Sequence, residues 1–224
     1  MAVIHRATLK PTKLELLAPW LDQQSWSGSG GELERIGSYR FDDPAGEVGI
    51  EGFLLRRGSD ILHVLLTYRG EPLPGTDDQL IGTMEHSVLG TRWVYDGIGD
   101  PVGQDALRRA LRGEQGQALL EIHDDAGTVV QRPEPDVRVR LVVADTATPG
   151  TPALTSVEDA FDAVGTGDER FLVARRPSAP GAGPGQGAGP GQGAGPGQGV
   201  GHSQGGSRLV ATWANGEAVI ASLG

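Results

Sequence analysis

Alternating apolar and polar positions predict three β-strands in the first third of the chain. These strands cover residues 35–41, 48–57 and 61–69. In the last of them, every second residue from Leu62 to Tyr68 is apolar or aromatic, which is the period of a half-buried strand. A Gly-Ser-Asp turn separates the last two strands, so we expect them to form a β-hairpin.

Three short helices are predicted around the strands. Thr12 and Glu15 fit a capping box before a leucine-rich segment, and Pro19 is expected to kink this helix or end it early because proline lacks an amide hydrogen. A second helix is expected over residues 104–111, where apolar residues share one face. A third is expected near residues 157–163, with the preceding serine as its N-cap.

The second half of the chain contains further short strands, expected near residues 118–123, 128–131 and 137–144. Close to the end, RLVATW and EAVIASL flank an Asn-Gly pair, the strongest short signal for a hairpin turn. Because a lone hairpin is barely stable in water, we expect it to dock beside residues 171–175. Together these elements predict an α+β fold with mainly antiparallel sheets and a few short helices.

A repetitive segment interrupts the second half. The hexamer GAGPGQ occurs three times over residues 181–198 and is followed by a degenerate copy, GVGHSQ. Glycine falls at every second position and not at every third, which excludes a collagen helix. Such a tract offers almost no apolar surface to offset its ordering entropy. We therefore expect residues 177–207 to be a flexible insertion.

Aromatic residues are distributed unevenly along the chain. Eight of the eleven lie before residue 100, so the second half must build its core mainly from Val, Leu and Ala. We predict a first α+β subdomain over residues 1–102. A second would combine residues 103–176 with residues 208–224, including the final hairpin.

Composition places the chain among acidic, soluble proteins. The net charge is −10, with 29 acidic and 19 basic residues, so neither nucleic acid nor an anionic membrane is an expected partner. No apolar run is long enough for a membrane span, and no signal peptide is evident. Cysteine is absent, which excludes disulfides and thiolate metal sites. We expect a cytoplasmic protein.

The stretch EHSVLGTRWVYDGIGDPV, residues 85–102, concentrates polar and aromatic residues between glycines. One interpretation is a buried bend, in which the two aromatic residues fill the core and Arg92 pairs with Asp96 or Asp100. The other is a groove, because aromatic faces and polar groups of this kind hold a sugar or a partner loop. The candidate binding residues are His86, Arg92, Trp93, Tyr95, Asp96 and Asp100.

Three longer segments in the first half can be compared with known proteins. They are HRATLKPTKLELLAPWLDQQSW, SYRFDDPAGEVGIEGFLLRRG and HVLLTYRGEPLPGTDDQLIGTMEHSVLGTRWVYDGIGDPV. Together they resemble the N-terminal cap region of actinobacterial maltokinases and related aminosugar kinases, over about residues 4–125. The resemblance implies a cystatin-like cap, an antiparallel sheet curved around a helix, that sits on a kinase-like body. It also implies a place in trehalose, maltose and α-glucan metabolism.

The chain departs from these kinases in two ways. Many caps carry Arg-Trp-Phe and then Gly-Lys-Gly after the first helix, where this chain has Ser25-Trp26-Ser27 and Gly28-Ser29-Gly30. The motifs of a kinase body are also absent: no lysine follows Lys13, and neither a catalytic-loop motif nor a DFG-like triplet is found. Phosphoryl transfer needs these parts, so we expect no kinase activity from this chain.

Other chemistries lack their motifs as well. There is no Gly-x-Ser-x-Gly elbow, and the five histidines show no metal-ligand spacing. Carboxylates between Asp42 and Glu51 could form a glycosidase pair, but the sequence Asp-Asp-Pro-Ala-Gly among them is typical of a turn. No catalytic residue, metal or cofactor is assigned.

Three functions stay open from the sequence. The first is a stand-alone, non-catalytic cap-like protein, an interaction or regulatory module whose partner is an enzyme of trehalose, maltose or α-glucan metabolism. The second is a carbohydrate or sugar-phosphate binding module centred on residues 92–96. The third is a small α-glucan-active enzyme using the acidic turn, or an accessory to a glucan branching enzyme.

Overall fold

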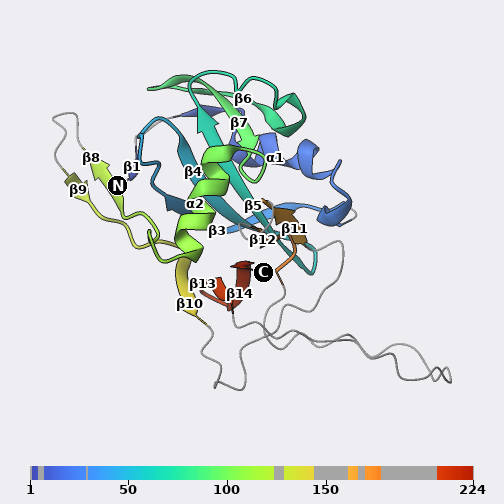
Figure 1. The fold of residues 1–224 in the computed structure, drawn as a ribbon. Coiled ribbons are helices and arrows are strands. Elements are labelled where there is room, and N and C mark those ends of the chain that lie inside the picture. Colours follow the sequence, from blue (N-terminus) through green and yellow to red (C-terminus); the bar gives the residue numbers. More distant parts are fainter. Residues whose placement is uncertain are drawn as a thin grey trace, which may run out of the picture.

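The protein consists mainly of antiparallel β-sheets with two α-helices (Figure 1), which confirms the predicted fold class. The computed structural model describes residues 2–4, 8–28, 30–123, 129–143, 161–165, 170–177 and 206–223. Within these residues the strands form three sheets, of six, five and three strands.

The largest sheet curls into a half-barrel and has the strand order β2-β6-β7-β5-β4-β3. All its neighbouring strands are antiparallel. The three strands predicted from alternation are β3, β4 and β5, and each is confirmed to within two residues at either end. The strands are β2 (Leu9–Lys10), β3 (Leu33–Phe41), β4 (Gly49–Arg57), β5 (Asp60–Arg69), β6 (Leu80–His86) and β7 (Gly90–Asp96).

Two tight turns shape this sheet. The predicted turn joins β4 to β5, and there Gly58 has a φ of +59°, a left-handed conformation that favours glycine. Residues 87–89 join β6 to β7, and Gly90 follows them with a φ of +73°. The interpretation of residues 85–102 as a bend is therefore wrong. Much of this segment is strand, because β5 and β6 pair with β7 on both sides and satisfy its backbone groups.

Helix α1 (Lys13–Leu21) covers one face of the curled sheet. The predicted capping box is present: the Thr12 side chain accepts from the Glu15 N–H, and the Glu15 carboxylate accepts from the Thr12 N–H. Pro19 lies inside the helix, which continues to Leu21, so the predicted early end is not observed. Leu21 is fully buried against the sheet, and this packing offsets the hydrogen bond that proline removes.

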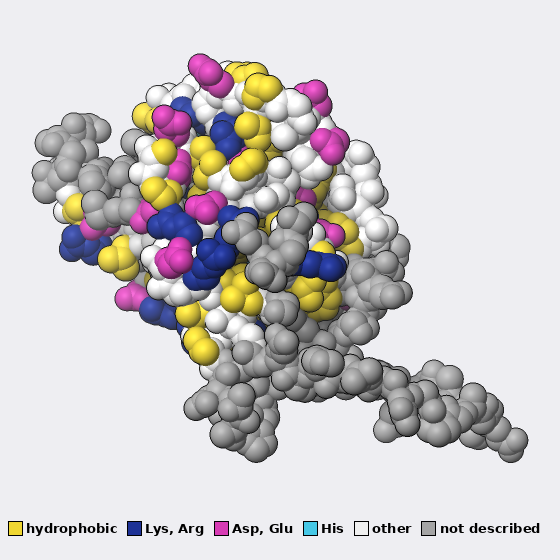
Figure 2. All heavy atoms as spheres, in the orientation of Figure 1, with side chains coloured by type: hydrophobic (Ala, Val, Ile, Leu, Met, Phe, Trp, Pro, Cys, Tyr) yellow, Lys and Arg dark blue, Asp and Glu magenta, His cyan; other side chains and the backbone are white. Residues whose placement is uncertain are grey.

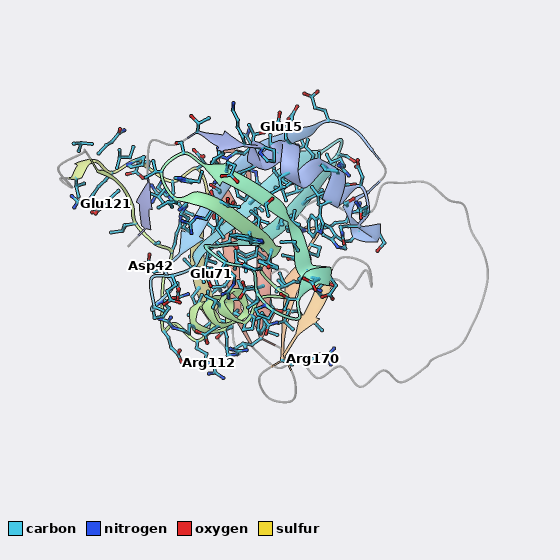
Figure 3. All side chains as sticks on the ribbon, turned by 90° about the horizontal axis from the view of Figure 1, so that it is seen from above. Glu15, Asp42, Glu71, Arg112, Glu121 and Arg170 are labelled. Atoms are coloured by element: carbon cyan, nitrogen blue, oxygen red, sulfur yellow. The ribbon has the colours of Figure 1, made fainter. Side chains whose placement is uncertain are left out.

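Helix α2 (Pro101–Leu111) covers the opposite face, so the curled sheet lies between the two helices (Figure 3). It begins three residues earlier than predicted, because Asp100 caps it by accepting from the Val102 N–H and proline suits the first helical position. Leu107 on its inner face is fully buried. Around α2, basic and acidic side chains are interspersed on the surface (Figure 2).

The five-stranded sheet has the order β10-β13-β14-β12-β11, and all its pairs are antiparallel. The hairpin predicted from the Asn-Gly pair is β13–β14, and β14 pairs with β12 as predicted. The strands are β10 (Arg138–Val143), β11 (Phe161–Val164), β12 (Phe171–Ala174), β13 (Ser207–Trp213) and β14 (Gly216–Leu223). In the small sheet, β1 (Ala2–Ile4) runs parallel to β8 (Leu120–His123), which pairs antiparallel with β9 (Val129–Gln131).

The prediction of a helix near residues 157–163 is wrong for the residues of this range that the structure describes. Residues 161–164 form strand β11, in which Phe161 lies opposite Ala174 of β12. A short apolar run fits the period of a helix and that of a strand equally well. Here pairing at the edge of a sheet satisfies the backbone groups of the run, so it forms a strand. The start of the predicted helix and residues 178–205 of the predicted insertion lie outside the described residues.

Two hydrophobic clusters fill the space between the layers. One lies between α1 and the curled sheet and includes Leu17 and Phe53. The other joins the opposite face of that sheet to α2 and to the five-stranded sheet, through Leu54, Leu107 and Trp213. This second cluster draws on both predicted subdomains, and the division between them stays a prediction.

Candidate functional site

The six candidate residues lie in different places along β7 and its two ends. His86 and Arg92 are at the hairpin end. The His86 ring nitrogen Nδ1 accepts from the N–H groups of Val88 and Leu89, at 3.2 and 3.1 Å. Arg92 donates through Nη2 to the Leu89 carbonyl at 2.5 Å. Both side chains therefore hold the turn between β6 and β7.

Trp93 and Tyr95 face the side of the sheet that carries α2. They lie opposite Arg69 and Thr67, whose side chains reach the start of that helix. Tyr95 is buried, and its hydroxyl accepts from the Leu73 N–H at 2.8 Å, which fixes the proline-rich loop before β6. Trp93 is half-buried. Tyr95 thus fills the core as predicted, and Trp93 does so only in part.

Asp96 ends β7 and binds Arg175, which directly follows β12 of the five-stranded sheet. Arg175 donates through Nη2 to Asp96 and through Nε to Asp162, the latter at 2.6 Å. The Arg175 side chain is only 2% exposed, and its Cζ atom lies 4.8 Å from the centre of the Trp26 ring. One buried cation is therefore enclosed by two carboxylates and an indole.

Asp100 has a structural environment. Its side chain is fully buried and accepts from Arg69, from the Thr67 hydroxyl and from the Val102 N–H. Burial by itself would raise the pKa of Asp100, but these hydrogen bonds and the arginine charge lower it below its ordinary value. The carboxylate is therefore ionised at neutral pH, as an arginine partner and an N-cap require.

The predicted pairing of Arg92 with Asp96 or Asp100 is wrong, because those aspartates bind Arg175 and Arg69. The physical reason is the extended backbone. Arg92 and Asp96 are four residues apart on one strand, which corresponds to about 13 Å at roughly 3.3 Å per residue. The six residues consequently do not line one groove, and their role in binding stays a prediction.

A polar cleft opens beside Asp96, where the end of β7 meets β11 and the short 3-10 helices η1 (Ser25–Ser27) and η2 (Asp77–Gln79). In Figure 1 the orange β11 lies next to the blue segment that follows α1. The cleft has a volume of about 700 Å³. It is lined by Gln24, Trp26, Thr76, Asp78, Gln79, Asp96, Ile98, Gly99, Gln104, Asp162, Ala163, Val164, Gly165 and Arg175.

Sequence reasoning found only Asp96 among these lining residues. Arg175 carried a signal that could have been used, because it directly follows the apolar run Phe171–Ala174, which is largely buried. A charged residue at the end of a buried strand needs a partner, since burying an unpaired charge is costly. The residues around Arg175 do not identify that partner, because Asp96 lies 79 positions earlier in the sequence.

A buried histidine ties the curled sheet to β12. The His63 atom Nδ1 lies 2.9 Å from the Ala174 carbonyl, and Nε2 lies 2.8 Å from the Tyr39 hydroxyl. Because a carbonyl only accepts, Nδ1 carries the hydrogen and Nε2 accepts from Tyr39. Burial is the main cause that lowers the pKa of His63 to about 4, so the ring is neutral at pH 7.

The acidic turn is built for structure. The Asp43 carboxylate accepts from the backbone N–H groups of residues 45, 47 and 48, as expected for a turn-forming aspartate. Glu51 is buried and accepts from Lys13 at 2.5 Å and from Arg40 at 3.3 Å. Carboxylates engaged in this way argue against a glycosidase pair in this turn.

Comparison with family models decides the relationship of the curled sheet to known proteins. Residues 20–100 match the family model described as the maltokinase N-terminal cap domain. This part of the chain is a maltokinase N-terminal cap domain. The resemblance expected from the sequence is confirmed over this range, while the rest of the chain is unassigned and there is no evidence of a kinase domain. No curated protein matched the chain.

The cap domain supplies one wall of the cleft and the unassigned part supplies the other. Trp26, Gln79 and Asp96 lie within the cap domain, whereas Asp162 and Arg175 do not. Across the described part of the chain, no helix has the length and apolarity to cross a membrane. In the same residues, no three His, Asp or Glu side chains gather closely enough to hold a metal ion.

Proposed function

We propose that this chain is a non-catalytic binding module that acts, through protein contacts, on a cytoplasmic enzyme of trehalose, maltose or α-glucan metabolism. The cap domain supports the metabolic setting, because its family is described by the name of a maltose-phosphorylating enzyme. The missing kinase motifs support a role in binding rather than in phosphoryl transfer.

The observation that carries this proposal is the coverage of the second face of the cap domain. The resemblance implies that a cap in a kinase sits on a catalytic body. In this chain, α2 and the five-stranded sheet cover the face opposite α1, and Leu54 and Leu65 are fully buried there with Leu107. A core closed by residues of the same chain supports a module that works without a kinase body.

Protein contacts require exposed side chains that a partner can bury. Val88 and Leu89 are adjacent at the tip of the β6–β7 hairpin and are 57% and 45% exposed. The contacts of His86 and Arg92 hold this tip in one conformation, which reduces the entropy lost on binding. We take this tip as the first contact site for the partner.

Co-purification with the full chain from native cytosol tests the proposal. We expect an enzyme of trehalose, maltose or α-glucan metabolism in stoichiometric amount, recovered again when that enzyme is the bait. The double variant Val88→Ser, Leu89→Ser should lose it. The control Val143→Ser, an exposed apolar residue on β10, should retain it. Recovery of no such enzyme, or transfer of phosphate from ATP to maltose or glucosamine, contradicts the proposal.

A second candidate function is favoured by the polar cleft. Carbohydrate and sugar-phosphate sites use carboxylate, amide and guanidinium groups to bind hydroxyls, and the cleft offers all three kinds. A thermal shift of the purified protein against a panel of sugars and sugar phosphates tests this function. The carbohydrate-binding function is contradicted if no compound raises the unfolding midpoint of the protein.

A further inference from the structure

The chain contains a single asparagine, Asn215, and a glycine follows it directly. In the structure, Ala214 and Asn215 form the turn that joins β13 to β14, and Trp213 lies opposite Gly216 where the two strands meet. Asn215 is exposed to solvent. The Asn215–Gly216 pair therefore lies at the surface, at the tip of the final hairpin.

The backbone of this turn does not require asparagine. A two-residue turn of type I′ needs a positive φ at both loop residues, which is why Asn-Gly is favoured in such turns. Among the described residues, a positive φ occurs only at glycines, and Gly216 is not one of them. Asn215 thus has an ordinary backbone conformation that most residues can adopt.

The side chain of Asn215 is not held by hydrogen bonds. Its amide makes none to any residue that the structure describes. Gly216, by contrast, is required by packing, because a Cβ atom added there would lie 2.8 Å from Cζ2 of Trp213. The fold therefore fixes the glycine and leaves the preceding amide free to rotate.

A free asparagine amide beside a glycine can react with the backbone. The backbone nitrogen of Gly216 bonds to Cγ of Asn215, and the bond from Cγ to the amide nitrogen breaks. Ammonia leaves with the proton of the Gly216 N–H, and a five-membered succinimide ring remains. Glycine has no side chain to hinder this approach, and the two reacting groups are adjacent in the chain. Water then opens the ring at either carbonyl, which gives aspartate or isoaspartate.

We propose that Asn215 is a site of spontaneous deamidation, and that its isoaspartate product loosens the final hairpin. In isoaspartate the chain runs through the former side chain, which adds a methylene group to the backbone between Trp213 and Gly216. These two residues pair directly, and β14 lies between β12 and β13. A change at this turn therefore acts on the centre of the five-stranded sheet. The reaction needs only water, and this inference is independent of the proposed binding function.

Incubation of the purified full chain at pH 7, followed by intact mass measurement and peptide mapping, tests the inference. We expect a mass gain of about 1 Da, because an amide becomes a carboxyl group. The gain should map to Asn215, and both aspartate and isoaspartate should be found there. It should be faster at pH 8, because the attacking backbone nitrogen must lose its proton.

Asn215→Gln is the matched control, because its longer side chain would have to close a less favourable six-membered ring. This variant should show no gain at position 215. A synthetic peptide of residues 210–220 verifies that the conditions allow the reaction. If the peptide reacts and the full chain does not, the fold protects Asn215 and the inference is overturned. An equal mass gain in Asn215→Gln overturns it as well, since the glutamines elsewhere would then be the source.

Asn215→Asp separates the new charge from the change in the backbone. It carries the carboxylate of the deamidated protein on a normal backbone. The isoaspartate fraction should therefore unfold at a midpoint about 2–4 °C below that of Asn215→Asp. Equal midpoints would contradict the loosening of the hairpin.

Discussion

Asp100 binds Arg69 through both of its carboxylate oxygens, with Oδ1 2.6 Å from Nη2 and Oδ2 2.7 Å from Nε. The same carboxylate caps α2 through the Val102 N–H at 2.9 Å. One side chain therefore fixes the helix start and its position on β5. Such two-point ion pairs are geometrically specific. Removing one partner lowers the stability of the fold strongly, because the other charge is left buried without a partner.

Asp100→Asn is expected to lower the free energy of unfolding by about 3 kcal/mol, because Arg69 is left without its anionic partner. Urea denaturation at pH 7 measures this change. Asp105→Asn removes an exposed partner of Arg108 and should change stability by less than about 0.5 kcal/mol. Equal destabilisation by the two substitutions would contradict a special role for the Asp100–Arg69 pair.

Acid should destabilise the protein in a window that His63 defines. The pKa of His63 is about 4 in the folded protein and 6.5 ordinarily, so between these values the unfolded chain binds more protons. The contribution of His63 to the free energy of unfolding is complete above pH 6.5 and is lost as the pH falls towards 4. The whole loss is about 3 kcal/mol. Unfolding curves at intervals of half a pH unit measure the slope.

His63→Gln should flatten the pH dependence, because the amide can bond to Ala174 and Tyr39 but does not titrate. Tyr39→Phe should keep the slope, because the imidazole is still buried, while lowering stability at pH 7 by about 1–3 kcal/mol through the unpaired Nε2. A wild-type slope in His63→Gln would exclude this histidine as its source.

Gly52→Ala is expected to cost about 2–3 kcal/mol in stability, as overpacking of a core does. A Cβ atom at position 52 would lie 2.1 Å from Cζ of Tyr39, whose ring lies over the glycine from the neighbouring strand. Gly116→Ala is the control, because nothing lies within 4 Å of its added Cβ. Thermal unfolding of both variants compares them, and equal midpoints would be inconsistent with this packing.

Shortening the repeat tract should have little effect on stability. Removing residues 181–192 takes out two GAGPGQ copies from the connection between β12 and β13. If the tract is flexible, as its composition predicts, closing the shorter loop changes stability by only about 0.4 kcal/mol. A Gly-Ser replacement of equal length should match the wild type. A loss above about 2 kcal/mol would indicate that the tract makes specific contacts.

Local sequence patterns were sufficient to predict a hairpin where both strands alternate clearly and strong turn residues join them. The β4–β5 and β13–β14 hairpins are of this kind, since Gly58 and the Asn-Gly pair mark their turns. β6 was missed because Gly82 interrupts its apolar run, and there the strand has a register shift against β7. The short run from Phe161 fits helix or strand equally, and only its neighbour β12 decides.

The candidate site was harder to predict because its members are distant in sequence. Asp96 was selected from its own segment, but its partner Arg175 comes from the opposite half of the chain. Nor did any local feature separate Asp96 from Asp100. One ends a strand at the cleft and the other caps a helix, although only three residues lie between them.

The central place of β14 in the five-stranded sheet has a consequence for biosynthesis. β12, which precedes Arg175, meets β13 through β14, and β14 leaves the ribosome after both of them. The curled sheet can form while these residues are still being translated, but its arginine partner gains a stable support only afterwards. The wall of the cleft that carries Arg175 is thus completed later than the curled sheet, and a nascent chain that still lacks β14 has no complete site to offer.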